Sequence, residues 1–456
     1  MSHHHTMQRR SFLQMLAAGL PQTSVGLSSL AAMGGLSAQT AQDSKFLICL
    51  YLQGGNDNAN TIVPISTAEY ADYQAARPSI CLSATEPLAI SPDLFSGPSL
   101  GLHPKLSYIA QLFNQGKAAV VANVGNLVVP VSKTQWNGGA PTVPVPMQLF
   151  SHSDQEAQWQ TCSPREQSRT GWLGRTSDIL SSTYTDANAK VSMSLSLGPN
   201  NVMLNGNKTV AYKLTSVGAA RLFGQDGLGG SATASAALRQ IYQPARGNLM
   251  ESHLSTVYKR SIEAESVVTA ALAQVTLANN FPTTSIGQQL YGVMRMMMAS
   301  RALGHRRQVY FVEARGFDAH ANLIEAQSLK LEELNAAVQS FCTALQANNL
   351  WSQSVLFTAS DFGRALQTNG KGSDHGWGSH HFVIGGPVKG KRIYGQWPRV
   401  ALLTPEDAGQ GRLIPTTAID QYAATMATWF GVSGTDLSYV LPNLGNFAAS
   451  NLGFLG

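Results

Sequence analysis

Residues 46–57 read FLICLYLQGGND, an apolar run that stops at two glycines and is followed by an acid. A short apolar run that is rich in strand formers and ends in a glycine turn is typical of a strand buried on both faces of a parallel sheet. The same pattern recurs at residues 117–123, 308–313, 354–358 and 381–384. These segments predict a mostly parallel sheet at the centre of the fold.

Helical patterns separate the predicted strands, at residues 104–114, 287–303, 323–348 and 417–430. In the third of these, apolar residues recur at steps of three and four and form one stripe that can face a sheet. Alternating strands and helices predict an α/β fold with helices on both faces of the sheet. Residues from about 160 to 290 are rich in small polar residues, and the pattern predicts a helix at 248–277. We interpret this stretch as an insertion or cap within one domain of residues 39–456.

Composition excludes several classes of protein. The chain has 456 residues, of which 44% are hydrophobic and 12% charged, so it can bury a core although its charged share is about half the roughly 25% of an average domain. The formal charge is +5, and no dense block of Lys and Arg marks a nucleic-acid surface. The four cysteines show no metal-binding spacing. Cys49 and Cys342 lie in apolar segments, which indicates buried free thiols.

Residues 8–13 read QRRSFL and precede a weakly hydrophobic stretch rich in Gly, Ala and Ser. Twin arginines before such a stretch resemble a twin-arginine export signal, here residues 1–38. The stretch is too interrupted for a transmembrane helix, which needs about 20 largely apolar residues, and no later run is long enough for a stable membrane span. We therefore expect a periplasmic or secreted protein that meets the twin-arginine export machinery.

Acids and imidazoles follow or precede the predicted strands with unusual regularity. In open parallel sheets, ligands bind beyond the carboxyl ends of the strands, and oxygen and nitrogen donors that converge there can hold a divalent cation. Each motif also has a plainer interpretation: Asp361 could cap a following helix, and Asp374 with His375 could form a surface turn. The residues concerned are Asp57, Asp318, His320, Asp361, Asp374, His375, His380 and His381.

A further polar segment, residues 151–155, reads SHSDQ and leads into a probable helix. The N-terminus of a helix favours an anion, so Ser151 or Ser153 could contact a bound oxyanion or attack it with the help of a cation. The alternative is that Ser151, Ser153 or Asp154 caps the helix and does nothing more.

Several motifs together resemble the bacterial secreted family called domain of unknown function 1501. They are GGNDNANTIVP, the His103-Pro104 pair, SHSDQEAQWQT, GFDAH, TASDFGR, DHGWGSHHFVIGG with VKGKRIYG after it, and LIPTTAIDQYAATMATWFGV. The family is regarded as sulfatase-like, within the alkaline phosphatase superfamily. The resemblance implies an alkaline-phosphatase-like α/β sandwich that uses divalent cations and a Ser, Thr or formylglycine nucleophile to hydrolyse phosphate or sulfate esters.

The resemblance also implies roles for single residues. Asp57 would be the first metal ligand, Asp318 and His320 would belong to one metal site, and Asp361 would stand where the superfamily has Asp-His-Gly. Phe362 occupies the place of the expected histidine. The second metal site would therefore lack an imidazole unless the loop with Asp374 supplies His375 in its place. The last imidazole would come from His375, His380 or His381, and the nucleophile would be Ser151 or Ser153.

We therefore expect an exported hydrolase that depends on zinc, manganese or calcium and acts on a small anionic ester or a surface polymer. Lys389, Lys391 and Arg364 could balance the charge of the substrate. The alternative is a non-catalytic secreted binding or assembly protein that retains the fold and a structural metal. A carbohydrate enzyme associated with the cell wall is a third possibility, supported only by the seven tryptophans and the export route.

Overall fold

The apolar run at the start of the chain forms β1 (Lys45–Gln53), in which every residue from Phe46 to Leu52 is buried. The computed structural model describes residues 43–220, 231–242 and 247–456, so the expected export signal at residues 1–38 lies outside the described residues. β1 pairs in parallel with β9 (Arg307–Arg315) and with β10 (Ser354–Ser360). Burial on both sides explains why its sequence is continuously apolar rather than alternating.

These three strands are the centre of the main sheet, whose order is β14-β5-β13-β10-β1-β9-β6-β7-β8, with β15 beside β5. All pairings are parallel except those of β13 with β10 and β5, and that of β8 with β7. The other strands of this sheet are β5 (Ala118–Gly125), β6 (Ser194–Ser196), β7 (Tyr212–Thr215), β8 (Gly218–Ala219), β13 (Ser379–Gly385), β14 (Ile393–Tyr394) and β15 (Thr417–Ala418).

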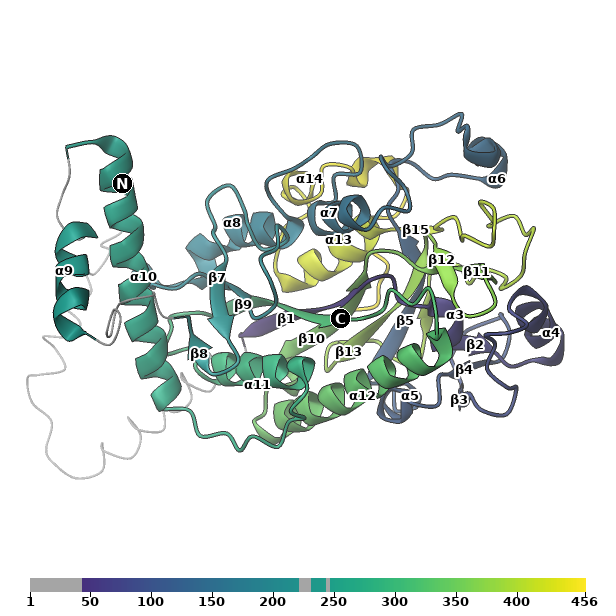
Figure 1. Ribbon diagram of the computed structural model, residues 1–456, viewed down its shortest axis with the longest axis horizontal. Helices are drawn as coiled ribbons and strands as arrows, with labels where there is room; N and C mark the ends of the chain where they lie inside the picture. The colour runs from purple at the N-terminus through teal and green to yellow at the C-terminus, as the bar shows by residue number, and fades with distance from the viewer. Residues whose placement is uncertain (1–42, 221–230, 243–246) are drawn as a thin grey trace, which may run out of the picture. The chain divides into compact units, whose positions relative to one another are not determined.

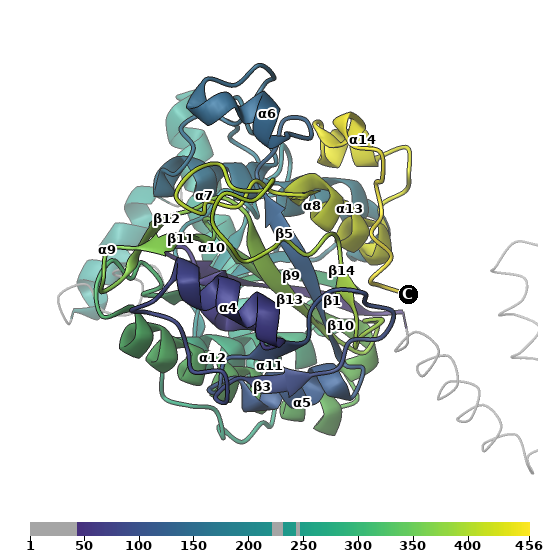
Figure 2. The ribbon, with the colours of Figure 1, turned by 90° about the vertical axis from the view of Figure 1, so that its right-hand side faces the viewer.

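Helices cover both faces of the sheet (Figures 1 and 2), as successive side chains of β1 enter two different hydrophobic clusters. Ile48 and Leu50 face one layer, and Leu47 and Cys49 face the other. The first layer contains α5 (Ser107–Asn114), α10 (Leu249–Ala273), α11 (Ser285–Met298) and α12 (Leu323–Ala347). The second contains α7 (His152–Thr161), α8 (Trp172–Tyr184), α13 (Ile419–Phe430) and α14 (Leu437–Val440). The expected α/β class with a mostly parallel central sheet is confirmed.

Smaller elements complete residues Lys45–Gly456, which form one compact unit. Two small sheets flank the main one, with strand orders β2-β4-β3 and β11-β12. Their strands and the short helices are β2 (Ile62–Pro64), β3 (Leu88–Ile90), β4 (Leu100–Leu102), β11 (Arg364–Thr368), β12 (Ser373–His375), α3 (Asn58–Thr61), α4 (Thr67–Ala76), α6 (Lys133–Trp136), α9 (Ala232–Tyr242), η1 (Asn137–Gly139), η2 (Trp351–Gln353) and η3 (Leu444–Asn446).

One strand runs against the sequence-based expectation. β13 is antiparallel to both neighbours, with Val355 opposite Gly385 at its far end. Its first residue, Ser379, therefore lies at the edge where β1, β9 and β10 end. This reversal brings a loop that precedes a strand to the same edge as loops that follow strands.

The segment from about 160 to 290 contributes β6, β7 and β8 to the main sheet in addition to its helices. All four cysteines lie in the described residues and are free, and Cys49 and Cys342 are buried as expected. None of the helices in the described part of the chain combines the length and apolar composition that crossing a bilayer requires.

Candidate metal centre

Imidazole and carboxylate groups from the loop after β9, from β12 and from α7 meet at this edge of the sheet. Asp318 and His320 follow β9, and His375 closes β12 just before β13. His152 is the first residue of α7, which packs over the end of the sheet. Together these groups form the centre of the site.

Three of these side chains form a compact triangle of possible metal ligands. Nε2 of His152 lies 3.1 Å from Nε2 of His375 and 3.4 Å from Oδ1 of Asp318. The third side, from His375 Nε2 to Asp318 Oδ1, measures 3.5 Å. We call His152, Asp318 and His375 the first ligand group.

A second ligand group, formed by His320, Asp374 and His375, shares one imidazole with the first. Nε2 of His320 lies 2.9 Å from Nε2 of His375 and 3.0 Å from Oδ1 of Asp318. Asp374 accepts a hydrogen bond from the backbone N–H of His375 at 2.8 Å and pairs with Arg412 at 3.1 Å. Nε2 of His375 has one lone pair and can therefore coordinate only one ion. An ion bound to this nitrogen would occupy either the first or the second ligand group.

Hydrogen bonds fix the tautomers of two imidazoles in the first ligand group. His152 donates from Nδ1 to Oδ2 of Asp361 at 2.7 Å, and His375 donates from Nδ1 to the carbonyl oxygen of Phe150 at 2.7 Å. In the neutral rings both Nε2 lone pairs are therefore free to face the centre, which is the arrangement found in metal-bound histidines. Phe150 has a φ of +70°, a conformation that residues with side chains rarely adopt.

The glycine turn after β1 allows the strand ends to approach one another closely. Asp361 is fully buried and also accepts a hydrogen bond from the backbone N–H of Gly54 at 3.2 Å. Gly54 has a φ of +112°, and a Cβ atom at this position would lie 2.5 Å from the backbone nitrogen of Asp318. Only glycine satisfies both conditions, so the turn predicted from the sequence is a requirement of the site.

Arg364 holds the carboxylate of Asp318 in place from the protein interior. Its guanidinium is fully buried and donates to Oδ1 of Asp318 at 2.7 Å, to the carbonyl of Gly54 at 3.2 Å and to that of Ser373. Burial raises the pKa of Asp318, but the hydrogen bond and charge of Arg364, together with His152 and His320, outweigh it and lower the pKa below its ordinary value. All these contacts join Arg364 to other groups of the protein, so Arg364 orients Asp318. It has no free face that could balance the charge of a substrate, which is the role expected from the sequence.

The two histidines of the first ligand group have opposite pKa shifts. The hydrogen bond to Asp361 raises the pKa of His152 above its ordinary value, against the opposing effect of burial. Burial lowers the pKa of His375, and the nearby charges of His152 and Arg364 lower it further, against the carbonyl of Phe150. The lowered pKa of His375 favours the neutral imidazole, which is the form that binds a metal.

Asp57, which the resemblance places at a metal site, has another partner. Both of its carboxylate oxygens accept from Arg77, at 2.6 and 2.9 Å, and both side chains are buried. The structure places it in neither ligand group. A sequence motif after a strand does not show which way the acid turns, and here α4 ends beside it and supplies a buried cation.

His380 and His381 are core residues. His380 stacks on Trp397 at 4.3 Å and accepts at Nδ1 from the backbone N–H of Asn123. His381 packs against Trp159 and Tyr422. Burial lowers the pKa of each to about 3, so both are neutral side chains of the two cores and join neither ligand group.

The hydroxyls proposed as nucleophiles contact a neighbouring acid. Oγ of Ser151 donates to Oδ2 of Asp154 at 2.6 Å and lies 3.2 Å from Oγ of Ser153. Ser151 occupies the N-cap position of α7 without a capping hydrogen bond from its side chain. Lys389 and Lys391 follow β13, at the opposite edge of the sheet, and Lys391 pairs with Asp93 at 3.1 Å.

His152 belongs to the first ligand group but is not among the residues that the sequence motifs predicted for the site. The ring of Phe362 occupies the place where a histidine was expected and packs against His152 at 4.7 Å and His375 at 4.8 Å. The missing imidazole comes from α7 instead. A signal existed, because His152 lies between the two serines that had been singled out as nucleophiles.

The first ligand group fits a divalent metal. Donors bound to zinc at 2.0–2.1 Å in a tetrahedron lie about 3.3 Å apart, and the three separations in the first ligand group are 3.1, 3.4 and 3.5 Å. Two imidazoles and one carboxylate are the ligand set of catalytic zinc and of non-haem iron, with one or more positions left open. This donor set favours a transition metal over calcium.

The fold and the site define an α/β protein with a transition-metal type of ligand set at the carboxyl edge of its sheet. The chain belongs to the family described as "Protein of unknown function (DUF1501)", which matches residues 44–426. No curated protein matches its sequence.

Solved structures of similar fold include a sulfatase, a protein bound to a neocarrahexaose and an alkaline phosphatase. PsFucS1 sulfatase from Pseudoalteromonas sp. is 9% identical over 89% of this chain and 76% of that chain, with a TM-score of 0.32. Ps i-CgsB in complex with k-i-k-neocarrahexaose is 9% identical over 86% and 73%, with a TM-score of 0.34. Thermus thermophilus alkaline phosphatase is 12% identical over 71% and 60%, with a TM-score of 0.24. Because these TM-scores are low, the chemistry must be argued from the residues of this chain.

Proposed function

We propose that the protein is a metal-dependent hydrolase of phosphate or sulfate esters. The observation that carries the proposal is the first ligand group, in which His152, Asp318 and His375 converge within 3.5 Å of one another. Bound there, a divalent cation would supply positive charge for the anionic ester and would lower the pKa of a hydroxyl or water nucleophile.

The protein's own residues prepare the site for this task. Asp361 and the carbonyl of Phe150 keep the Nε2 atoms of two imidazoles turned toward the centre. Arg364 keeps Asp318 ionised and in place. A fixed ligand arrangement requires little reorganisation when substrate arrives, which is the condition for electrostatic stabilisation of a transition state.

Space for a small substrate lies next to these ligands. A cavity of about 290 Å³ is lined by His320 and Asp374 of the second ligand group and by uncharged polar side chains of Gln367, Thr368 and Gln410. His320 and Asp374 are about half exposed. The centre is therefore accessible from solvent on this side.

Glu156 is our candidate proton donor to the leaving group. It lies one helical turn after His152 on α7, and Gln160 donates to its Oε1 at 2.9 Å. Burial, with the charges of Asp361 and Glu313, raises its pKa to about 7. A carboxyl group that is half protonated near neutral pH is suited to general acid catalysis.

The test is hydrolysis of p-nitrophenyl phosphate and p-nitrophenyl sulfate by purified protein loaded in turn with Zn²⁺, Mn²⁺ and Fe²⁺. We expect turnover with at least one ion, and its loss in His375→Ala. His253→Ala is the matched control, because His253 is an exposed imidazole on α10 that contributes to neither ligand group. Stoichiometric metal without turnover on a broad ester panel would reject the hydrolase.

A second function, that of a non-catalytic metal-containing binding protein, is favoured by the contacts of Ser151 and Ser153 with Asp154. If a serine is the nucleophile, Ser151→Ala or Ser153→Ala abolishes turnover but retains the metal. If water is the nucleophile, both variants remain active. Only the binding protein predicts bound metal and no turnover in the unchanged chain.

We also propose that the protein acts outside the cytoplasm, on the basis of the twin arginines at residues 9 and 10. Replacing both by lysine in the full chain should stop its export, which fractionation of the producing cells measures. Export of this variant at the original rate would contradict the proposal.

A further inference from the structure

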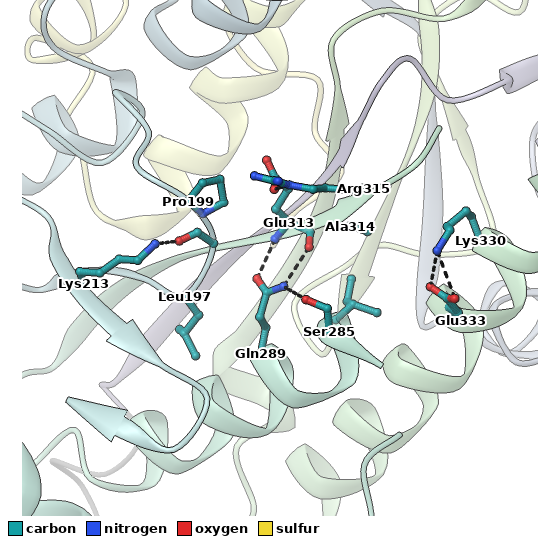
Figure 3. Close-up of a pocket in the computed structure, with 12 residues that line it drawn as sticks. Leu197, Pro199, Lys213, Ser285, Gln289, Glu313, Ala314, Arg315, Lys330 and Glu333 are labelled. Atoms are coloured by element: carbon teal, nitrogen blue, oxygen red, sulfur yellow. Dashed lines mark hydrogen bonds and ion pairs between the residues drawn. The ribbon is translucent and has the colours of Figure 1, made fainter. Parts of the chain in front are cut away.

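A second cavity, of about 470 Å³, opens beyond the ends of β6 and β9. Figure 3 shows its walls, which come from the segment after β6, from β7, β9, α11 and α12. Its volume lies within the range of small-molecule sites. Gln289 of α11 fixes one wall, because it accepts from the backbone N–H of Glu313 at 3.0 Å and donates to the carbonyl of Glu313 at 2.9 Å.

The cavity is rich in cations. Lys213, Arg315 and Lys330 line it, against two acids, Glu313 and Glu333. Lys330 pairs with Glu333 at 2.9 Å. The ammonium of Lys213 donates to the carbonyl of Gly198, which is neutral, and the charge of Glu313, which is already paired with Arg315, also acts on it.

Arg315 presents the outer part of its guanidinium to the cavity. It contacts the buried carboxylate of Glu313 through Nε, while its side chain remains 68% exposed. The ion pair has its shortest contact, and its hydrogen bond, at Nε rather than at an Nη atom. A planar pair of Nη donors is the arrangement that binds phosphate and sulfate oxygens.

The cavity adjoins the candidate metal centre along the chain and in space. Arg315 precedes Asp318 by three residues, which limits their Cα separation to about 11 Å. A Cβ atom on Gly316, between them, would lie 3.1 Å from Cε of Lys330, so the stem of this lysine covers the connecting loop. The charge of Glu156 interacts with Arg315 at the cavity and with Asp361 and His152 at the metal centre.

We propose that this cavity binds a second anionic group on the substrate, so that the enzyme prefers esters that carry more than one phosphate or sulfate. The inference rests on the proposed function, since the ester at the metal centre is the first anionic group. The second group would be held by the Nη donors of Arg315 and the ammonium of Lys213. Leu197, Pro199 and Ile286 offer apolar contacts to the skeleton between the two groups.

The test compares binding of glucose 1,6-bisphosphate and glucose 6-phosphate to the zinc-loaded protein by calorimetry at pH 7.5. We expect the bisphosphate to bind about tenfold more tightly, as for one added charge-assisted contact. In Arg315→Met and in Lys213→Met this ratio should fall toward one, while the affinity for the monophosphate stays within about twofold.

Two further variants keep the result interpretable. Glu313→Gln with Arg315→Met removes both partners and avoids a buried unpaired carboxylate, and it should also lose the preference. Lys259→Met removes the same charge from an exposed position on α10 and should keep the preference. An equal affinity for both sugars in the unchanged protein, or a preference that survives in both single variants, overturns the proposal.

Binding separates this proposal from the proposed function. If no ester is hydrolysed but the bisphosphate preference depends on Arg315 and Lys213, the hydrolase is rejected and the anion site remains. If esters are hydrolysed and the two sugars bind equally, the anion site is rejected and the hydrolase remains.

Discussion

Replacing Asp361 by Asn should weaken metal binding although Asp361 belongs to neither ligand group. Its Oδ2 accepts from Nδ1 of His152 at 2.7 Å and from the backbone N–H of Gly54 at 3.2 Å. Asn keeps the shape and one acceptor but loses the negative charge that makes His152 a stronger donor. Carboxylates that orient metal-bound histidines typically account for a tenfold to hundredfold change in affinity, or about 1.4 to 2.7 kcal/mol.

The assay is competition for Zn²⁺ with a chromophoric chelator at pH 8. This pH lies above the ordinary pKa of histidine of about 6.5, so that protons compete little with the metal. Asp374→Asn is the matched control, because it makes the same chemical change in the second ligand group. An affinity of Asp361→Asn within twofold of the unchanged protein, or a larger loss in Asp374→Asn, would refute the assignment of the ion to the first ligand group.

Three further predictions concern stability. Asp57→Asn should lower the free energy of unfolding by about 3–5 kcal/mol in urea, because it leaves buried Arg77 unpaired, and should leave the metal stoichiometry unchanged; loss of metal would restore Asp57 as a ligand. Arg364→Met should lower it by about 2–4 kcal/mol, because two backbone carbonyls lose their donor; an unchanged urea midpoint would contradict this. His380 and His381 have folded pKa values of about 3 against 6.5, so their stabilisation is complete above pH 6.5 and is lost as the pH falls toward 3. At pH 5 each should contribute about 2 kcal/mol less, and equal urea midpoints at pH 7.5 and 5 would refute it.

Much of the fold follows from local sequence patterns. Apolar runs and helical periodicity depend on burial and on backbone geometry, so the strands β1, β9 and β10 and the helix α12 are found close to their predicted bounds. The direction of β13 was not predictable in this way, because a strand buried on both faces has the same composition whichever way it runs.

The structure brings together those predicted side chains whose position follows from the chain direction alone. Asp318 and His320 leave β9 at the carboxyl edge, and the structure brings them to His375 as expected. His380 and His381 do not join the site, and the reason is their position within a strand. They are consecutive residues of β13, so their side chains point to opposite faces of the sheet and enter the two cores rather than the edge.

The position of His152 shows why the site could not be derived from strand motifs alone. A ligand at residue 362 would follow β10 directly, and here that residue is Phe362, whose ring lies against two histidines. An imidazole is supplied to the same space by the first turn of α7, which is remote in sequence, and buried Asp361 orients it. The site needs an imidazole Nε2 at its centre and a carboxylate that binds Nδ1 of the same ring. A residue at the end of a strand or at the start of a helix can supply that imidazole. The acid after β10 therefore has a place in the site, as the partner of an imidazole that comes from another element.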